Sequence, residues 1–145
     1  RITVLLSEEH GIGKSTLAEI LASTFSPELV VFFNSHAEFA DSFNLSLANR
    51  LFWFIDDCSG ISVKEAQALN SKATAKQMKF NEKNEKAFWL PIKNSIIITS
   101  NDVNPLFCPP EDRRQMYWKV APHYKNRRDF FAKFQKSLHI SAKLN

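Results

Sequence analysis

The chain has 145 residues, 44% of them hydrophobic, and a formal net charge of +4, which suits one domain with its own core. The apolar runs fall far short of the roughly 20 residues that cross a bilayer, and no signal peptide precedes them, so we expect no membrane span. Two cysteines without metal-ligand or disulfide spacing favour a reducing compartment, such as the bacterial cytoplasm or a viral replication site. Because a strand pattern begins directly at Arg1, we expect that an upstream segment has been removed.

The hydrophobic pattern alternates between strand-like and helical segments. Apolar runs predict strands at residues 2–6, 29–33, 51–55, 95–99 and 116–120. Helical patterns cover residues 14–23, a stretch from Ser35 through residue 43, a stretch from Ser62 to about Ala75, and residues 126–138. Ser62 with Glu65 three residues later is typical of a capping box. We therefore expect residues 1–145 to form one α/β domain around a mainly parallel sheet.

Residues 78–91 depart from this alternation. They switch between apolar and polar positions around a polar tip at residues 81–85, which predicts a β-hairpin. The tip lacks the Asn-Gly or Asp-Gly pair that tight hairpins favour. Phe80 and Phe88 are candidates for stacking on bases, although for Phe88 and Trp89 a place in the core at the base of the hairpin is favoured over stacking.

A glycine-rich loop lies between the first predicted strand and the first predicted helix, and it holds two of the three glycines. Glycine lets the backbone approach an anion, and the helix N-terminus adds positive potential. Lys14 is suited to neutralise β and γ phosphates, and the Ser15 hydroxyl is suited to bind Mg²⁺. We predict that ATP and Mg²⁺ bind at Gly11, Ile12, Gly13, Lys14, Ser15 and Thr16.

The loop departs from the usual pattern at Glu8, where a glycine is standard. The acidic pair Glu8 and Glu9 is unfavourable near a triphosphate unless both side chains point to solvent. This departure bears on the tightness of binding.

Polar residues follow two further predicted strands. Asp56 is placed to support Mg²⁺, and Asp57 to orient or deprotonate an attacking water. Asn101 can both donate and accept hydrogen bonds, as a residue between the γ-phosphate and that water must. Taken alone, two aspartates after a strand are more often a helix cap or a turn, and an asparagine there is more often an Asx-turn. Their occurrence in one chain with the glycine-rich loop favours a catalytic role.

Positive charge is distributed unevenly. Residues 113–145 hold nine lysines and arginines but a single acid, Asp129. A second cluster, diluted by Glu82 and Glu85, consists of Lys72, Lys76, Lys79, Lys83 and Lys86. Basic stripes favour a nucleic-acid backbone as partner, whereas either cluster alone also fits a solvated lysine face.

The ordered segments Gly-Ile-Gly-Lys-Ser-Thr (11–16), Phe-Ile-Asp-Asp (54–57), Ile-Ile-Ile-Thr-Ser-Asn (96–101) and Asp-Arg-Arg (112–114) resemble those of superfamily 3 helicases, particularly the poxvirus-type and phage primase-helicases. The resemblance implies a three-layer P-loop NTPase fold of the AAA+ type, with a five-stranded sheet, an inserted β-hairpin and assembly as a homo-hexamer. It gives Lys14 and Ser15 the Walker A roles and Asn101 the sensor role. Asp56 and Asp57 take the Walker B roles, although many relatives have glutamate in place of Asp57.

The same resemblance implies a DNA-dependent motor that hydrolyses ATP, with single-stranded DNA expected as partner rather than RNA. Its nucleic-acid-binding residues would be Lys72, Lys79, Lys83 and Lys86, in a segment that forms a channel-lining hairpin in relatives. Arg114, or else Arg113, would reach the γ-phosphate of the neighbouring subunit. The alternatives are a P-loop small-molecule kinase, for which no lid insertion is evident, and an RNA-directed ATPase.

Overall fold

The computed structural model describes residues 1–40, 44–81, 83–106 and 112–142. The elements are β1 (Ile2–Leu6), α1 (Lys14–Thr24), η1 (Pro27–Leu29), β2 (Val30–Phe33), α2 (His36–Phe39), η2 (Leu45–Leu47), β3 (Phe52–Ile55), α3 (Val63–Thr74), β4 (Gln77–Phe80), β5 (Phe88–Pro91), β6 (Ser95–Ser100), β7 (Gln115–Lys119), η3 (Pro122–Tyr124) and α4 (Arg128–Ala142). All five predicted sheet strands are present, and their ends shift by no more than one residue.

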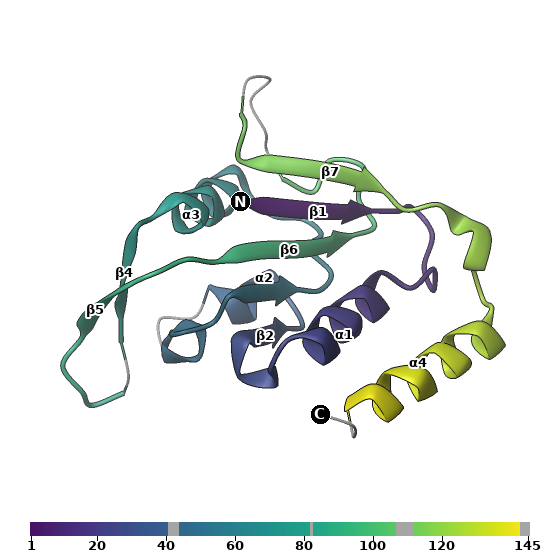
Figure 1. The fold of residues 1–145 in the computed structure, drawn as a ribbon. Helices are drawn as coiled ribbons and strands as arrows, with labels where there is room; N and C mark the ends of the chain where they lie inside the picture. Colours follow the sequence, from purple (N-terminus) through teal and green to yellow (C-terminus); the bar gives the residue numbers. More distant parts are fainter. Residues whose placement is uncertain (41–43, 82, 107–111, 143–145) are drawn as a thin grey trace.

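The five-stranded sheet has the order β2-β3-β6-β1-β7, and all four strand pairs are parallel. The arrows of β1, β6 and β7 accordingly run the same way in Figure 1. The predicted mainly parallel sheet is therefore confirmed. Since parallel strands end at one edge, the segments that follow β1, β3 and β6 meet there.

The central strands β1, β3 and β6 are largely buried on both faces of the sheet, as their unbroken apolar runs require, whereas the edge strand β7 is mostly exposed. One face packs against α2 and α3 in a cluster that includes Val4, Trp53, Ile98, Phe39 and Leu69. On the other face, Leu5 lines a cleft together with Leu17 of α1 and Phe134 of α4. The helices α1 and α4 lie on the same side of the sheet in Figure 1. The sheet thus forms the middle of three layers.

The helix α3 begins with the predicted capping box. Ser62 Oγ accepts the Glu65 N–H, and the Glu65 carboxylate accepts the Ser62 N–H at 2.8 Å. Ser35 likewise caps α2 by accepting the Glu38 N–H. However, α2 ends at Phe39 after a single turn, and Ala40 is its C-cap. The expected helix therefore stops before residue 40 and does not continue toward residue 43. Residues 41–43 lie outside the described part of the chain.

The predicted hairpin is confirmed as β4 and β5, which pair antiparallel in a separate two-stranded sheet. Its connection spans residues 81–87, longer than a two-residue turn. Phe80 is fully buried, whereas Trp89 is 60% exposed, the reverse of their expected roles. The pleat explains this outcome, because Phe80 and Met78 share the face toward the core while Trp89 pairs with Lys79 on the opposite face.

Replacing Ser62 with alanine should lower the free energy of unfolding by about 1 kcal/mol, because the first turn of α3 loses its cap. Urea unfolding measures this change. Ser71→Ala is the matched control, since that hydroxyl donates only to the Gln67 carbonyl one turn earlier in the same helix. The control should stay within about 0.5 kcal/mol of the wild type. Equal losses in both variants would contradict the capping role.

Candidate functional site

The loop between β1 and α1 is turned by glycines. Gly11 and Gly13 have φ angles of +71° and +94°, in the left-handed region that side chains rarely adopt. The Glu9 N–H donates to Ser7 Oγ at 3.0 Å and closes the start of the loop. The helix α1 then begins at Lys14. The predicted order of strand, loop and helix is confirmed, and the helix N-terminus lies at the loop.

The acidic pair in the loop is directed away from its interior. Glu9 forms an ion pair with Lys125, which follows η3, and Glu8 is exposed to solvent. The unfavourable charge expected from these two residues is therefore offset by a lysine from the C-terminal segment and by water.

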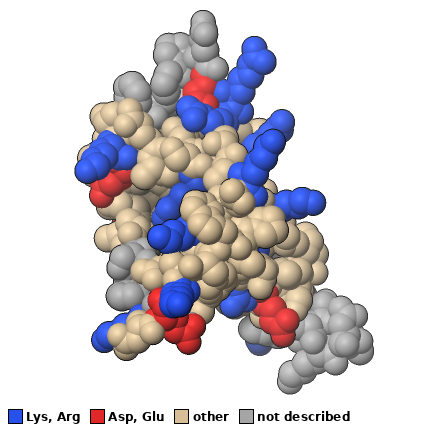
Figure 2. Space-filling model, turned by 90° about the vertical axis from the view of Figure 1, so that its left-hand side faces the viewer, with Lys and Arg blue, Asp and Glu red and all other residues tan. Residues whose placement is uncertain are grey.

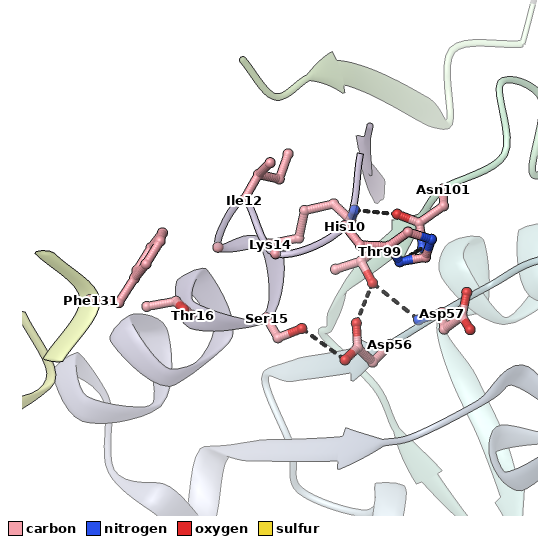
Figure 3. Close-up of a pocket in the computed structure, with 12 residues that line it drawn as sticks. His10, Ile12, Lys14, Ser15, Thr16, Asp56, Asp57, Thr99, Asn101 and Phe131 are labelled. Carbon is pink, nitrogen blue, oxygen red and sulfur yellow. Dashed lines mark hydrogen bonds between the residues drawn. The ribbon is translucent and has the colours of Figure 1, made fainter. Parts of the chain in front are cut away.

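The loop borders a cavity of about 430 Å³ at the carboxyl edge of the sheet (Figure 3). Its lining residues are His10, Gly11, Ile12, Gly13, Lys14, Ser15, Thr16, Asp56, Asp57, Thr99, Asn101 and Phe131. All the residues predicted from the sequence for the nucleotide, the metal and the attacking water thus border one cavity. The strands that carry them, β1, β3 and β6, are neighbours in the sheet.

Lys14 reaches into this cavity from the first residue of α1. Its ammonium donates to Asn101 Oδ1 at 2.6 Å and to the Glu9 carbonyl at 3.3 Å. Partial burial lowers the pKa of Lys14, and the nearby carboxylates of Asp56 and Asp57 oppose that shift. The cation is therefore held between the loop and the end of β6.

The acidic side of the cavity is organised by Thr99, at the end of β6. Its hydroxyl donates to Asp56 Oδ1 and accepts the Asp57 N–H at 3.1 Å. Ser15 Oγ donates to the other oxygen, Asp56 Oδ2, at 2.8 Å. Asp57 itself has a φ of +49°, and the Ser59 hydroxyl donates to its Oδ1 at 3.1 Å. The two aspartates therefore leave the strand in different directions.

Three residues that line the cavity, His10, Thr99 and Phe131, were missed by sequence reasoning. His10 lies in the loop with its Nδ1 3.2 Å from Asn101 Nδ2, and Thr99 links the two aspartates. A polar residue at the buried end of β6 was a signal for Thr99. For His10 the only available signal was its position inside the loop, since no pattern distinguishes it from its neighbours.

The structure places three of the four predicted nucleic-acid-binding lysines on the hairpin. Lys79 lies on β4, Lys83 and Lys86 lie in the connection, and all three are exposed. Figure 2, which looks onto the hairpin end of the molecule, shows separate Lys and Arg side chains projecting from this face, with Asp and Glu between some of them. The positive charge is spread out and does not form one continuous patch.

Lys72 is placed apart from the other three lysines. It lies on α3, with its Nζ 4.2 Å from the centroid of the Phe39 ring, and it donates to the Phe39 carbonyl at 3.5 Å. Burial lowers the pKa of Lys72. These contacts give it a packing role between α2 and α3, which the spacing of lysines in the sequence did not reveal.

Arg113 and Arg114 lie at the amino end of β7, the opposite edge of the sheet from Lys14. This position agrees with the expectation that both arginines lie away from the glycine-rich loop of their own chain. Arg114 donates two hydrogen bonds to the Asp112 carboxylate, from Nε to Oδ1 at 2.8 Å and from Nη2 to Oδ2 at 2.6 Å. These hydrogen bonds lower the pKa of the Asp112 carboxyl and fix the direction of the Arg114 side chain.

Other kinds of site find less support within the described residues. They contain no cluster of three or more His, Cys, Asp and Glu side chains suited to a metal ion, and none of their helices is long and apolar enough to cross a membrane. Burial raises the pKa of the Cys58 thiol to about 12, so it is not a thiolate nucleophile at neutral pH. Cys108 lies outside the described residues.

Together, these features define an α/β protein with a parallel five-stranded sheet, an antiparallel hairpin and a polar cavity at the carboxyl ends of its strands. The chain belongs to a family of unknown function (DUF5906), whose model matches residues 5–114. The matched segment runs from β1 to the residue before β7 and includes every side chain named at the polar cavity except Phe131. No match was found among curated proteins.

Several solved structures of the C-terminal region of NrS-1 have a similar fold. One superposes with a TM-score of 0.81 at 21% identity, covering 98% of this chain and 35% of that one. Another gives a TM-score of 0.76 at 20% identity, covering 97% and 33% respectively. The chain thus spans about a third of the length of these structures. Identities this low establish the fold alone, and they do not identify the chain as a superfamily 3 helicase.

The glycine geometry makes a prediction that is independent of any ligand. A Cβ added at Gly13 would lie 2.5 Å from Phe131 Cε1 in addition to the strained φ, so Gly13→Ala should lower the free energy of unfolding by well over 1 kcal/mol. Gly60→Ala is the matched control, because its φ is +67° but a Cβ there meets nothing within 4 Å. The difference between the two costs should shrink in a Phe131→Ala background, as urea unfolding would show. An unchanged difference would contradict the contact between α4 and the loop.

Proposed function

We propose that this chain is the ATPase domain of a nucleic-acid motor that hydrolyses ATP to move along or unwind DNA. One observation carries the proposal: Lys14, Ser15, Asp56, Asp57 and Asn101, drawn from the ends of three neighbouring strands, border the same cavity. The likeness of the ordered motifs to superfamily 3 helicases and the fold shared with the NrS-1 region both support it. On this proposal the domain belongs to the P-loop class and is of the AAA+ type.

The nucleotide would bind through the loop. Backbone N–H groups of residues 11–16 face the phosphates together with the N-terminus of α1, and Lys14 exchanges its bond to Asn101 for the β and γ phosphates. Mg²⁺ fits the hydroxyl of Ser15 and the carboxylate of Asp56, because it takes few protein oxygens beside phosphate oxygens and water. Bound there, Mg²⁺ would neutralise charge on the phosphate oxygens.

Hydrolysis requires a water in line with the γ-phosphorus. In the proposed mechanism, Asp57 accepts a proton from that water as its oxygen bonds to phosphorus and the bond to the ADP oxygen breaks. Asn101 orients the water and the γ-phosphate through its amide. Thr99 is a positioning residue, because its hydroxyl holds the Asp56 carboxylate and the Asp57 backbone N–H.

The hairpin would contact single-stranded nucleic acid, with DNA favoured over RNA by the resemblance. Exposed Lys79, Lys83 and Lys86 suit contacts to phosphates, which carry no sequence information. Trp89, opposite Lys79 and 60% exposed, offers a ring on which a base can stack. In the proposed homo-hexamer this hairpin lines the channel, and Arg113 or Arg114 reaches the nucleotide of the adjoining subunit.

ATP hydrolysis by the full-length protein should increase when single-stranded DNA is added. A small-molecule kinase would show no such increase, and stimulation by RNA alone would favour the RNA-directed alternative.

Lys14→Ala should abolish ATP binding in calorimetry, because the charge facing the phosphates is lost. Asp57→Asn should still bind ATP but hydrolyse it about a hundredfold more slowly. Normal turnover by Asp57→Asn would show that this carboxylate is not the base.

The hairpin lysines have a separate test. Lys83→Ala combined with Lys86→Ala should weaken binding of single-stranded DNA and reduce the slope of log K against log salt by about 1.4, or about 0.7 for each lost phosphate contact. Lys64→Ala with Lys133→Ala removes the same charge from exposed positions on α3 and α4, and should change the slope far less. If both pairs have the same effect, the hairpin has no special contact with DNA.

A further inference from the structure

A second cleft of about 330 Å³ opens beside the polar cavity, between α1 and the segment from Val120 to Phe134. Gly13, Lys14, Thr16 and Phe131 border both spaces. The two therefore adjoin at the phosphate loop. The remaining lining of the cleft is almost entirely apolar, and comprises Leu5, Leu17, Ile20, Val120, Tyr124, Phe130 and Phe134.

The polar cavity has two chemically different ends (Figure 3). Asp56, Asp57 and Asn101 lie at one end, where the metal and the attacking water would act on the γ-phosphate. Thr16 and Phe131 lie at the other end. A triphosphate with its γ-phosphate at the acidic end must direct its α-phosphate, and whatever is attached to it, toward Thr16 and Phe131. The apolar cleft begins at that end.

The cleft presents aromatic faces. The rings of Tyr124 and Phe130 stack with centroids 4.3 Å apart and planes 20° apart, and Phe130 is nearly parallel to Phe134 at 6.2 Å. Tyr124 is 48% exposed and Phe130 37% exposed. Partly exposed aromatic rings are suited to stacking on a planar ring, and every nucleobase offers one.

The aromatic cluster is held at a fixed place relative to the phosphate loop. Lys125, the residue after Tyr124, forms the ion pair with Glu9, and the Asn126 N–H donates to the Gly11 carbonyl at 3.4 Å. Further along α4, Gln135 donates to Glu19 of α1 at 3.0 Å. These contacts fix the distance between the cleft and the loop, which a ligand that occupies both would require.

We propose that this cleft seats the base of the bound nucleotide, by stacking and apolar contact, without reading the hydrogen-bonding edge of the base. The inference rests on the proposed phosphate site and extends it to the other half of the ligand. Apart from Lys14, the lining offers only the hydroxyls of Tyr124 and Thr16 as side-chain hydrogen-bonding groups. Purines that differ only in their edges, such as adenine and guanine, should therefore bind with similar affinity.

Calorimetry on the full-length protein with Mg²⁺ tests the proposal, using ATP, GTP and inorganic tripolyphosphate as ligands. Tyr124→Ala should weaken ATP and GTP by a similar factor of about five or more, and leave tripolyphosphate binding unchanged. Tyr124→Phe should retain wild-type affinity, because the ring remains. Trp118→Ala, which removes an exposed aromatic ring outside the cleft, should change none of the three affinities. Thermal unfolding of each variant checks that the fold is intact.

The outcomes separate the base site from the phosphate site. If Tyr124→Ala binds ATP and GTP as the wild type does, or weakens tripolyphosphate by the same factor, the cleft does not hold the base while the phosphate site stands. A strong preference of the wild type for ATP over GTP would also overturn the proposal, because such a preference requires a group that reads the hydrogen-bonding edge of the base. If the wild type binds none of the three ligands, the proposed function fails as well.

Discussion

The parallel pairing of β1 with β6, and of β6 with β3, is the constraint on which the site depends. It brings the loop after Leu6, the acids after Ile55 and the asparagine after Ser100 to one edge of the sheet, although they are far apart in the sequence. An antiparallel neighbour would carry its polar end to the opposite edge. The buried apolar residues of these strands therefore fix the direction in which each strand ends, and the hydrogen bonds from Lys14 to Asn101 and from Thr99 to Asp56 join ends that the sheet has already aligned.

The C-terminal segment adds a second constraint. Phe131 lies so close to Gly13 that a single Cβ would collide with it, and Lys125 forms an ion pair with Glu9, the neighbour of the departing residue Glu8. The ion pair offsets one of the two acidic charges beside the site proposed for a triphosphate, and the other acid, Glu8, is exposed to solvent. Because of these contacts α4 and the loop form one structural unit, so a change in the conformation of the loop should shift the position of α4.

The amino-acid sequence was sufficient for the strands, the hairpin and the polar cavity because each has a strong local signal: unbroken apolar runs, a glycine loop and acids at a strand end. It was insufficient where packing in three dimensions decides. Lys72 shares its spacing with the hairpin lysines but packs on Phe39, and Trp89 faces outward while Phe80 is buried because the pleat assigns them opposite faces. His10 and the bond between Thr99 and Asp56 arise from strand adjacency, which periodicity along one strand does not encode.

The central claim is that the cavity at the carboxyl edge of the sheet holds a triphosphate and Mg²⁺. A crystal structure of the full-length protein with Mg²⁺ and a non-hydrolysable ATP analogue tests it most directly. The account predicts phosphate density against the backbone of residues 11–16, Lys14 moved from Asn101 to the phosphates, and a metal ion near Ser15 and Asp56. Phosphates bound elsewhere, or an unchanged bond between Lys14 and Asn101 in a nucleotide-saturated crystal, would contradict it.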